Sequence, residues 1–252
     1  MSLYSFNLVV WTWLIIAVLV FIVLMFIPAP YGRFTSKSWG VMIPDRLGWF
    51  FMEIPSLLVF GYFFFAGSAG HSSALVFTAS LWLLHYIHRS LIFPFRIRTR
   101  KKKMPLAIPA MAVFFNLVNG FLNGYYLGNM TVPGGWYSFK NPWLIAGAIL
   151  FFAGLVINLQ SDEILISLRK NSENGYAIPY GGMFRWVSCP NYLGELMEWA
   201  GFAIMAWNLA AVSFFLWTFA NLVPRALNYQ RWYKKTFTDY PPERKAIIPY
   251  LL

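Results

Sequence analysis

Long apolar runs constrain this chain most, because they recur along nearly its whole length. A helix needs about 20 predominantly apolar residues to cross the hydrocarbon core of a bilayer, where only helices and closed barrels satisfy their backbone polar groups. Runs of that length cover residues 7–27, 48–66, 73–95, 106–127 and 142–159. A further block, Leu193 to Val223, is too long for one span, and Trp207-Asn208 within it predicts a turn. The sequence therefore predicts an all-α, polytopic membrane helix bundle with seven transmembrane helices.

The composition agrees with a chain whose main solvent is lipid. Of its 252 residues, 59% are hydrophobic and only 12% are charged, which is far from the balance of a soluble domain. The single cysteine excludes an intrachain disulfide, and the three histidines lack partners at ligand spacing, so we expect no metal site. No repeat or soluble segment interrupts the pattern, so residues 1–252 are expected to form one membrane domain.

Lysine and arginine are distributed unevenly between alternate turns of this predicted bundle. The turns near 67–72, 128–141 and 207–209 contain only Lys140, whereas the other 19 of the 20 cations lie in or toward the alternate turns and the tail. By the positive-inside rule the cation-rich turns face the cytoplasm, which places the N-terminus outside and the C-terminus in the cytoplasm. The net charge of +11 is thus explained by topology, and we expect no nucleic-acid partner.

The run from Arg96 to Lys103 holds six cations in eight positions. Such a cluster fits an anchor to anionic lipid headgroups, and it equally fits a binding site for phosphate. Both interpretations place it at the cytoplasmic mouth of the bundle.

Two polar stripes lie within the apolar sequence that follows. One joins Asn158 to Asp162 at a spacing of i, i+4, and the other follows Asn191, Glu195 and Glu198. Carboxylates and amides suit ribose hydroxyls and an amide-bearing ring, while arginine and lysine suit phosphates. No GxGxxG or GxxxxGK[ST] motif occurs, so the stripes predict a nucleotide site built without a Rossmann or P-loop domain.

Glu53 and Tyr86 are polar residues of two neighbouring apolar runs. Counted from the cytoplasmic ends of their expected helices, both lie at a similar depth. A carboxyl group at membrane depth is costly unless it has a partner or a function. Arg89 follows Tyr86 at i+3 and is expected on the same face, and His85 and His88 share the same relation. These side chains predict either a set of hydrogen bonds between helices or a reaction site.

Several motifs resemble, in the same order, those of the membrane steroid 5α-reductases. They are Glu53-Ile-Pro-Ser56, His85-Tyr-Ile-His-Arg89, Gly135-Trp-Tyr137, Asn158 to Asp162 with Leu168-Arg-Lys170, Asn191-Tyr-Leu-Gly-Glu195, and the tail from Asp239 to Pro249. The resemblance covers nearly everything after the first expected helix. It implies a seven-helix reductase that uses NADPH to saturate the 4,5 double bond of 3-oxo-4-ene steroids.

The resemblance also assigns residues. Glu53 and Tyr86 would bind the steroid 3-oxo group. The dinucleotide would be bound by His88, Arg89, Arg98, Arg100, Asn158, Asp162, Arg169, Tyr176, Asn191, Glu195, Tyr229 and Tyr233. Similar proteins usually carry a histidine three or four residues before the position of Tyr233, where this chain has Tyr229 and Gln230. That departure affects one cofactor contact and leaves the reaction class unchanged.

The reaction implied is hydride transfer to steroid C5 while charge develops on the 3-oxo oxygen. A protonated Glu53 carboxyl and the Tyr86 hydroxyl would both donate to that oxygen. The first four helices are expected to form the substrate pocket. The last three helices, the cytoplasmic loops and the tail would hold the cofactor.

Three other interpretations compete. Pro190 to Gly194 also resembles the segment that holds S-adenosylmethionine in isoprenylcysteine-type membrane methyltransferases. A reductase of this kind could instead act on a polyprenol or an enoyl thioester, and a non-enzymatic lipid-binding or scaffold protein would use the same polar residues only to join helices. The expected partners are a steroid or related enone lipid and the bilayer, with no obligate protein partner. The membrane is a bacterial inner membrane or the endoplasmic reticulum, with the cofactor site facing the cytoplasm.

Overall fold

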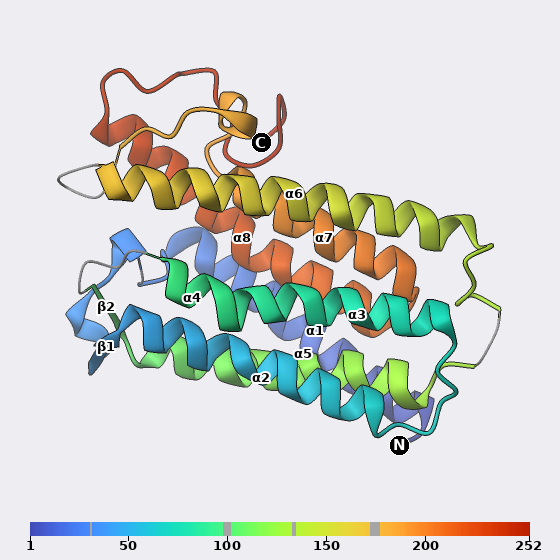
Figure 1. Ribbon diagram of the computed structural model, residues 1–252. Coiled ribbons are helices and arrows are strands. Elements are labelled where there is room, and N and C mark those ends of the chain that lie inside the picture. The colour runs from blue at the N-terminus through green and yellow to red at the C-terminus, as the bar shows by residue number, and fades with distance from the viewer. Residues whose placement is uncertain (31, 98–101, 133–134, 172–176) are drawn as a thin grey trace.

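The computed structural model describes residues 1–30, 32–97, 102–132, 135–171 and 177–252, and its long helices run side by side along one axis (Figure 1). The helices are α1 (Leu3–Phe26), α2 (Asp45–Phe65), α3 (Ser73–Ile87), a π-helical segment (His88–Ile92), α4 (Phe93–Arg96), α5 (Ala107–Asn129), α6 (Pro142–Asn171), α7 (Pro190–Ala206) and α8 (Leu209–Thr236). Short 3₁₀ turns cover Gly32–Phe34, Lys37–Trp39 and Gly182–Arg185. β1 (Met42–Pro44) pairs antiparallel with β2 (Lys103–Pro105).

Within the part of the chain that the structure describes, five helices are long and apolar enough to cross a membrane, namely α1, α2, α5, α8 and residues Pro142–Arg169 of α6. α3 and α7 are shorter, with 15 and 17 residues. α3 continues through the π-helical segment into α4 as one rod (Figure 1). The predicted all-α bundle with membrane-grade helices is therefore confirmed.

The helix predicted over 73–95 is present, and within it lies a π-helical segment that the apolar pattern did not predict. Pro94 has no N–H to donate, and its ring crowds the carbonyl of Ser90 one turn earlier. A wider π turn relieves this crowding. The Ser90 hydroxyl donates back to the Tyr86 carbonyl at 2.5 Å, which satisfies a polar group of the same turn.

The turn predicted at Trp207-Asn208 is confirmed. Trp207 has left-handed backbone (φ 43°), which ends α7. Asn208 then caps α8, because its side-chain oxygen accepts the backbone N–H of Ala211 at 2.9 Å. Two antiparallel helices thus replace the long apolar block.

α6 and α7 approach closely because glycines face each other along their contact. A Cβ on Gly154 would lie 2.4 Å from the Gly194 carbonyl oxygen, and a Cβ on Gly147 would lie 2.6 Å from that of Gly201. Small residues at such crossings let membrane helices pack backbone to backbone. The close approach brings the polar stripes of the two helices into contact.

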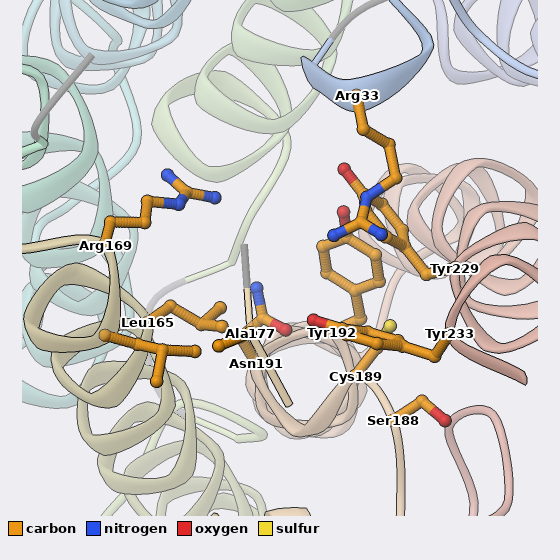
Figure 2. Close-up of a pocket in the computed structure, with 11 residues that line it drawn as sticks. Arg33, Leu165, Arg169, Ala177, Ser188, Cys189, Asn191, Tyr192, Tyr229 and Tyr233 are labelled. Atoms are coloured by element: carbon orange, nitrogen blue, oxygen red, sulfur yellow. The ribbon is translucent and has the colours of Figure 1, made fainter. Parts of the chain in front are cut away.

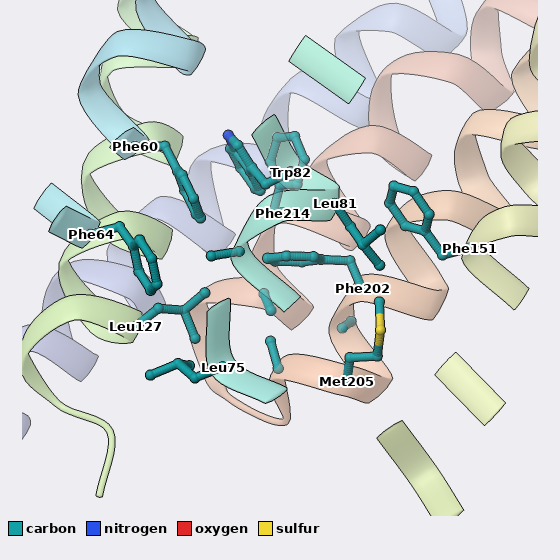
Figure 3. Packing of buried hydrophobic residues seen from close by; sticks show 14 of the residues in the cluster. Phe60, Phe64, Leu75, Leu81, Trp82, Leu127, Phe151, Phe202, Met205 and Phe214 are labelled. Carbon is teal, nitrogen blue, oxygen red and sulfur yellow. The ribbon is translucent and has the colours of Figure 1, made fainter. Parts of the chain in front are cut away.

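A cluster of aromatic and aliphatic side chains fills the interior between α2, α3, α5, α7 and α8 (Figure 3). Trp82 is fully buried at its centre, stacked on Phe60 at a ring-centroid distance of 4.8 Å and tilted against Phe214 at 4.6 Å. This packing fixes the rod that carries the polar residues of the site.

The connections separate into two ends of the bundle (Figure 1). At one end the N-terminal amine donates to the Tyr125 hydroxyl, and the α2–α3 connection bonds to the end of α5 through Ala69 and Gly128. At the other end lie the β1–β2 sheet and the C-terminal tail. We call these the amino end and the tail end.

Candidate active site

Glu53 of α2 and Tyr86 of α3 both contact the side chain of Asn116 of α5. The Asn116 Nδ2 group donates to Glu53 Oε2 at 3.5 Å, and the Tyr86 hydroxyl donates to Asn116 Oδ1 at 3.5 Å. Asn116 and Tyr86 are 3% and 4% exposed. The two residues predicted for the substrate oxygen are therefore joined by a third polar side chain that the sequence analysis did not identify.

The backbone of α2 contributes to the same cluster. Pro55 lies in the middle of this helix, and a helix proline disturbs the hydrogen bonds of the preceding turn. The carbonyl of Met52, in that turn, accepts the Asn116 amide at 2.5 Å. Asn116 thus contacts two consecutive residues of α2.

Arg89 lies one turn beyond Tyr86 on the same rod and bridges both polar stripes. Its guanidinium donates to Asp162 of α6 at 3.2 Å and to Glu195 of α7 at 3.5 Å. Asp162 also accepts the Asn191 amide at 3.3 Å, and Asn158 donates to the Asn191 carbonyl at 2.9 Å. The two stripes therefore converge as predicted, with one arginine between their carboxylates.

His85 and Glu198 form a separate buried pair. The His85 Nδ1 atom lies 2.8 Å from Glu198 Oε2, and the two side chains are 4% and 0% exposed. The His85 ring also packs edge-on against Trp199 at 4.6 Å. This pair joins α3 to α7 in the apolar core, where each charged group alone would be costly.

A pocket at the tail end collects four of the predicted cofactor residues (Figure 2). Arg169 of α6, Asn191 of α7, and Tyr229 and Tyr233 of α8 all line it. The pocket is also lined by Arg33, Leu165, Leu168, Ala177, Ser188, Cys189 and Tyr192. Two arginines, an amide and three tyrosines thus face one space.

Arg33 comes from the connection between α1 and α2 and reaches toward α8 (Figure 2). Its guanidinium carbon lies 3.1 Å from the ring centroid of Trp232 and 4.8 Å from that of Tyr229. Arginine stacked on aromatic faces keeps its charge and its N–H donors. The pocket therefore has a cation on each of two opposite sides, Arg33 and Arg169.

The C-terminal tail closes against the start of α7. Ser188 and Cys189 donate their backbone N–H groups to the carbonyls of Lys245 and Ala246 at 2.8 and 3.0 Å. Arg244, 3% exposed, donates to the Pro179 carbonyl at 2.9 Å, and its own carbonyl accepts the Gln230 side chain at 2.5 Å. Gln230 thus anchors the tail, while the neighbouring Tyr229 faces the pocket.

Comparison with known proteins identifies the family of the chain. A family model described as 3-oxo-5-alpha-steroid 4-dehydrogenase matches residues 102–252. The chain belongs to this family of oxidoreductases. Steroid 5-alpha-reductase DET2 of Gossypium hirsutum is 38% identical over 246 residues, which cover 94% of this chain and 93% of the relative. The 3-oxo-5-alpha-steroid 4-dehydrogenase 1 of Rattus norvegicus is 39% identical over 227 residues, which cover 89% and 86%.

For a member of the 3-oxo-5-alpha-steroid 4-dehydrogenase family, the predicted residues divide into three groups. Glu53 and Tyr86 meet at Asn116, and Asp162 and Glu195 meet at Arg89. The third group lines the pocket and includes Asn191, which also bonds to Asp162 and Asn158. His88 is in none of these groups and packs beside Phe93, with ring centroids 6.4 Å apart. Arg98, Arg100 and Tyr176 lie outside the described residues. Of the basic cluster, Arg96 forms an ion pair with Glu163, and both side chains are about half exposed.

Proposed function

We propose that this protein reduces the 4,5 double bond of 3-oxo-4-ene steroids with NADPH. The observation that carries the proposal is the meeting of Glu53 and Tyr86 at one buried amide inside an apolar bundle. Two O–H groups held together in apolar surroundings suit an oxygen on which negative charge develops. Membership in the family favours this reaction over methyl transfer and over a non-catalytic role.

The donor set of the tail-end pocket fits a phosphorylated dinucleotide. Arg33 and Arg169 suit its phosphates, Asn191 suits an amide or a ribose hydroxyl, and Tyr229 and Tyr233 offer aromatic faces. When bound, NADPH supplies the hydride. Asn158, Asp162 and Glu195, one turn away along the stripes, would hold the end of the cofactor nearer to the substrate.

Glu53 and Tyr86 act on the 3-oxo group of the steroid. A protonated Glu53 carboxyl donates a hydrogen bond to the 3-oxo oxygen, and the single hydrogen of the Tyr86 hydroxyl turns from Asn116 Oδ1 to the same oxygen when the steroid binds. The electrons displaced when C5 accepts hydride are thus stabilised as an enolate. The enolate is then protonated at C4. The Arg89 ion pairs hold α6 and α7 against the rod, which keeps the cofactor residues next to Tyr86.

We also propose the finer topology. Seven spans, with the α3–α4 rod as the third and α7 as the sixth, put the N-terminus outside and the tail in the cytoplasm. The support is that the connections at the tail end are rich in cations, whereas those at the amino end hold only Lys140. The cofactor pocket at the tail end would then face the cytosol, and its NADPH, whether the membrane is a bacterial inner membrane or the endoplasmic reticulum.

Glu53→Gln and Tyr86→Phe test the proposed reaction. Tyr86→Phe removes one donor to the developing enolate, and Glu53→Gln replaces an acidic O–H donor with the weaker N–H donor of an amide. We therefore expect the turnover of a 3-oxo-4-ene steroid such as progesterone to fall about 10²- to 10³-fold. The affinity for NADPH should stay close to wild type, because neither residue lines the tail-end pocket. The measurements are product formation by mass spectrometry, with NADPH and with NADH, and cofactor titration of the purified protein.

Lost yield and lowered melting temperature with normal specific activity would mean that the two residues only join helices. Saturation of a polyprenol or an enoyl thioester, with no steroid turnover, would assign a different substrate to the same site. Binding of S-adenosylmethionine instead of NADPH would overturn the proposal altogether.

A further inference from the structure

The contacts of Asn116 determine how its amide is oriented. The carbonyl of Met52 can only accept a hydrogen bond, so the Asn116 atom at 2.5 Å from it must be the donating Nδ2. This leaves Oδ1 as the atom that accepts the Tyr86 hydroxyl, and it leaves the second Nδ2 hydrogen for Glu53 Oε2. One side chain thus uses its donor and acceptor atoms on three groups of α2 and α3.

The orientation also distinguishes the two oxygens of Glu53. In a protonated carboxyl the carbonyl oxygen is a stronger acceptor than the hydroxyl oxygen, which carries the donor hydrogen. The Asn116 N–H group at Oε2 therefore favours Oε2 as the carbonyl oxygen and Oε1 as the protonated one. Oε1 is then the atom that donates to a substrate oxygen.

We propose that Asn116 is a positioning residue for steroid reduction. It orients Glu53 and favours the Glu53 oxygen that carries the proton. Before the steroid binds it also accepts the Tyr86 hydroxyl, and so sets the position from which that hydrogen turns to the 3-oxo oxygen. This role rests on the proposed function, since it acts through the two donors to the 3-oxo oxygen.

The other buried asparagines of α5 have different partners. Asn119 donates to the Phe115 carbonyl of its own helix and accepts from Trp13, and Asn123 donates to the Asn119 carbonyl. Neither has a contact with α2 or α3 among the hydrogen bonds of the described residues. Asn123 is 1% exposed and lies two turns from Asn116 on the same face, so it is a matched control.

The experiment measures steroid turnover, NADPH affinity and melting temperature for Asn116→Leu and Asn123→Leu. We expect Asn116→Leu to lower kcat about 10- to 100-fold, because small misplacements of catalytic groups cost that much. The KM for NADPH should change less than about twofold. Asn123→Leu should keep kcat within about twofold of wild type, whatever its effect on the melting temperature.

A second measurement separates positioning from packing. In a Tyr86→Phe background the hydroxyl that Asn116 holds is gone, so Asn116→Leu should cost clearly less than it does in the wild type. Equal costs in the two backgrounds, or an unchanged kcat in Asn116→Leu, would overturn the inference while leaving the proposed function intact. Asn116→Ala replaces the leucine variant if the latter does not fold. Failure of both to fold, while Asn123→Leu folds, would assign Asn116 to folding and also overturn the inference.

Absence of steroid turnover in the wild type is a different result. It would overturn the proposed function and with it the positioning role. The two failures are thus distinguished by the activity of the unmodified protein.

Discussion

Cys189 is the single cysteine of the chain, and its thiol lines the tail-end pocket although it is only 5% exposed. Burial raises the pKa of the Cys189 thiol to about 12, and the nearby Arg33 guanidinium opposes only part of this shift. The thiolate is the reactive form, so a raised pKa keeps the residue inert at neutral pH. This cysteine is therefore a reporter on the pocket rather than a nucleophile.

We expect alkylation of Cys189 by iodoacetamide at pH 8 to be at least about 100-fold slower in the folded protein than in the detergent-denatured chain. The rate in the folded protein should keep rising between pH 8 and pH 10, because the thiolate fraction grows until the pH reaches the raised pKa. The denatured chain should level off near the ordinary thiol pKa, and mass spectrometry of timed samples measures both rates. Equal rates would show that the thiol is exposed and would contradict its burial in the structure.

Residues whose depth follows from their own helix could be located from the sequence. Glu53 and Tyr86 were singled out because polar residues in apolar runs are costly and because their depths match, while their role at the 3-oxo group came from the family resemblance and stays a prediction. Asn116 could not be separated from the other asparagines of its helix, since all of them share the same sequence environment. Arg33 was missed because its ring partners lie about two hundred positions further along the chain. Only the fold makes these two residues neighbours of the site.

The proposed cofactor site depends on the close packing of α6 against α7. A Cβ on Gly194 would lie 2.5 Å from the Asn158 backbone nitrogen and 2.6 Å from the Gly154 carbonyl oxygen. These are backbone atoms, so the helices themselves would have to separate. The Asn158 and Asp162 contacts with Asn191 lie beside this crossing.

Gly194→Ala should lower stability by about 1–3 kcal/mol, the usual cost of overpacking, and should weaken NADPH binding. Gly61→Ala of α2 is the control, because its Cβ would meet only Leu83 at 3.8 Å, an ordinary contact. Thermal melting in detergent and cofactor titration measure the two effects. A Gly194→Ala protein with unchanged melting temperature and NADPH affinity would contradict the close packing of α6 against α7.

At the level of elements, the length of the apolar runs located the helices well, but it did not reveal where the helical backbone is irregular. The ends of α2 and α5 lie within a few residues of the predicted runs, since lipid length and apolar composition define them. α6 continues to Asn171, beyond the predicted run 142–159. Hydropathy did not detect these last turns because their residues are largely polar. The π-helical segment has no signature in hydropathy, because it arises from the backbone geometry before Pro94.

In the whole molecule the α3–α4 rod connects the two halves of the site. His85 and Arg89 tie it to α6 and α7, and Tyr86 ties it to α5. The rod therefore contacts both the residues proposed for the substrate and those proposed for the cofactor. The proposed hydride transfer would require these two groups to keep a fixed relative position, and the buried polar contacts of the rod would maintain it.

The orientation of the whole bundle in the membrane decides which compartment supplies the reductant, and we expect the C-terminal tail to lie in the cytoplasm. A green fluorescent protein fused after Leu252 should fluoresce, and alkaline phosphatase at the same point should be inactive, because the 19 cations of the tail end hold it in the cytoplasm. The same reporters placed after Ser68, in the connection between α2 and α3 at the amino end, should give the opposite result. Active phosphatase at the tail would place Arg33 and Arg169 outside, away from cytosolic NADPH, and so contradict the cofactor assignment as well as the topology.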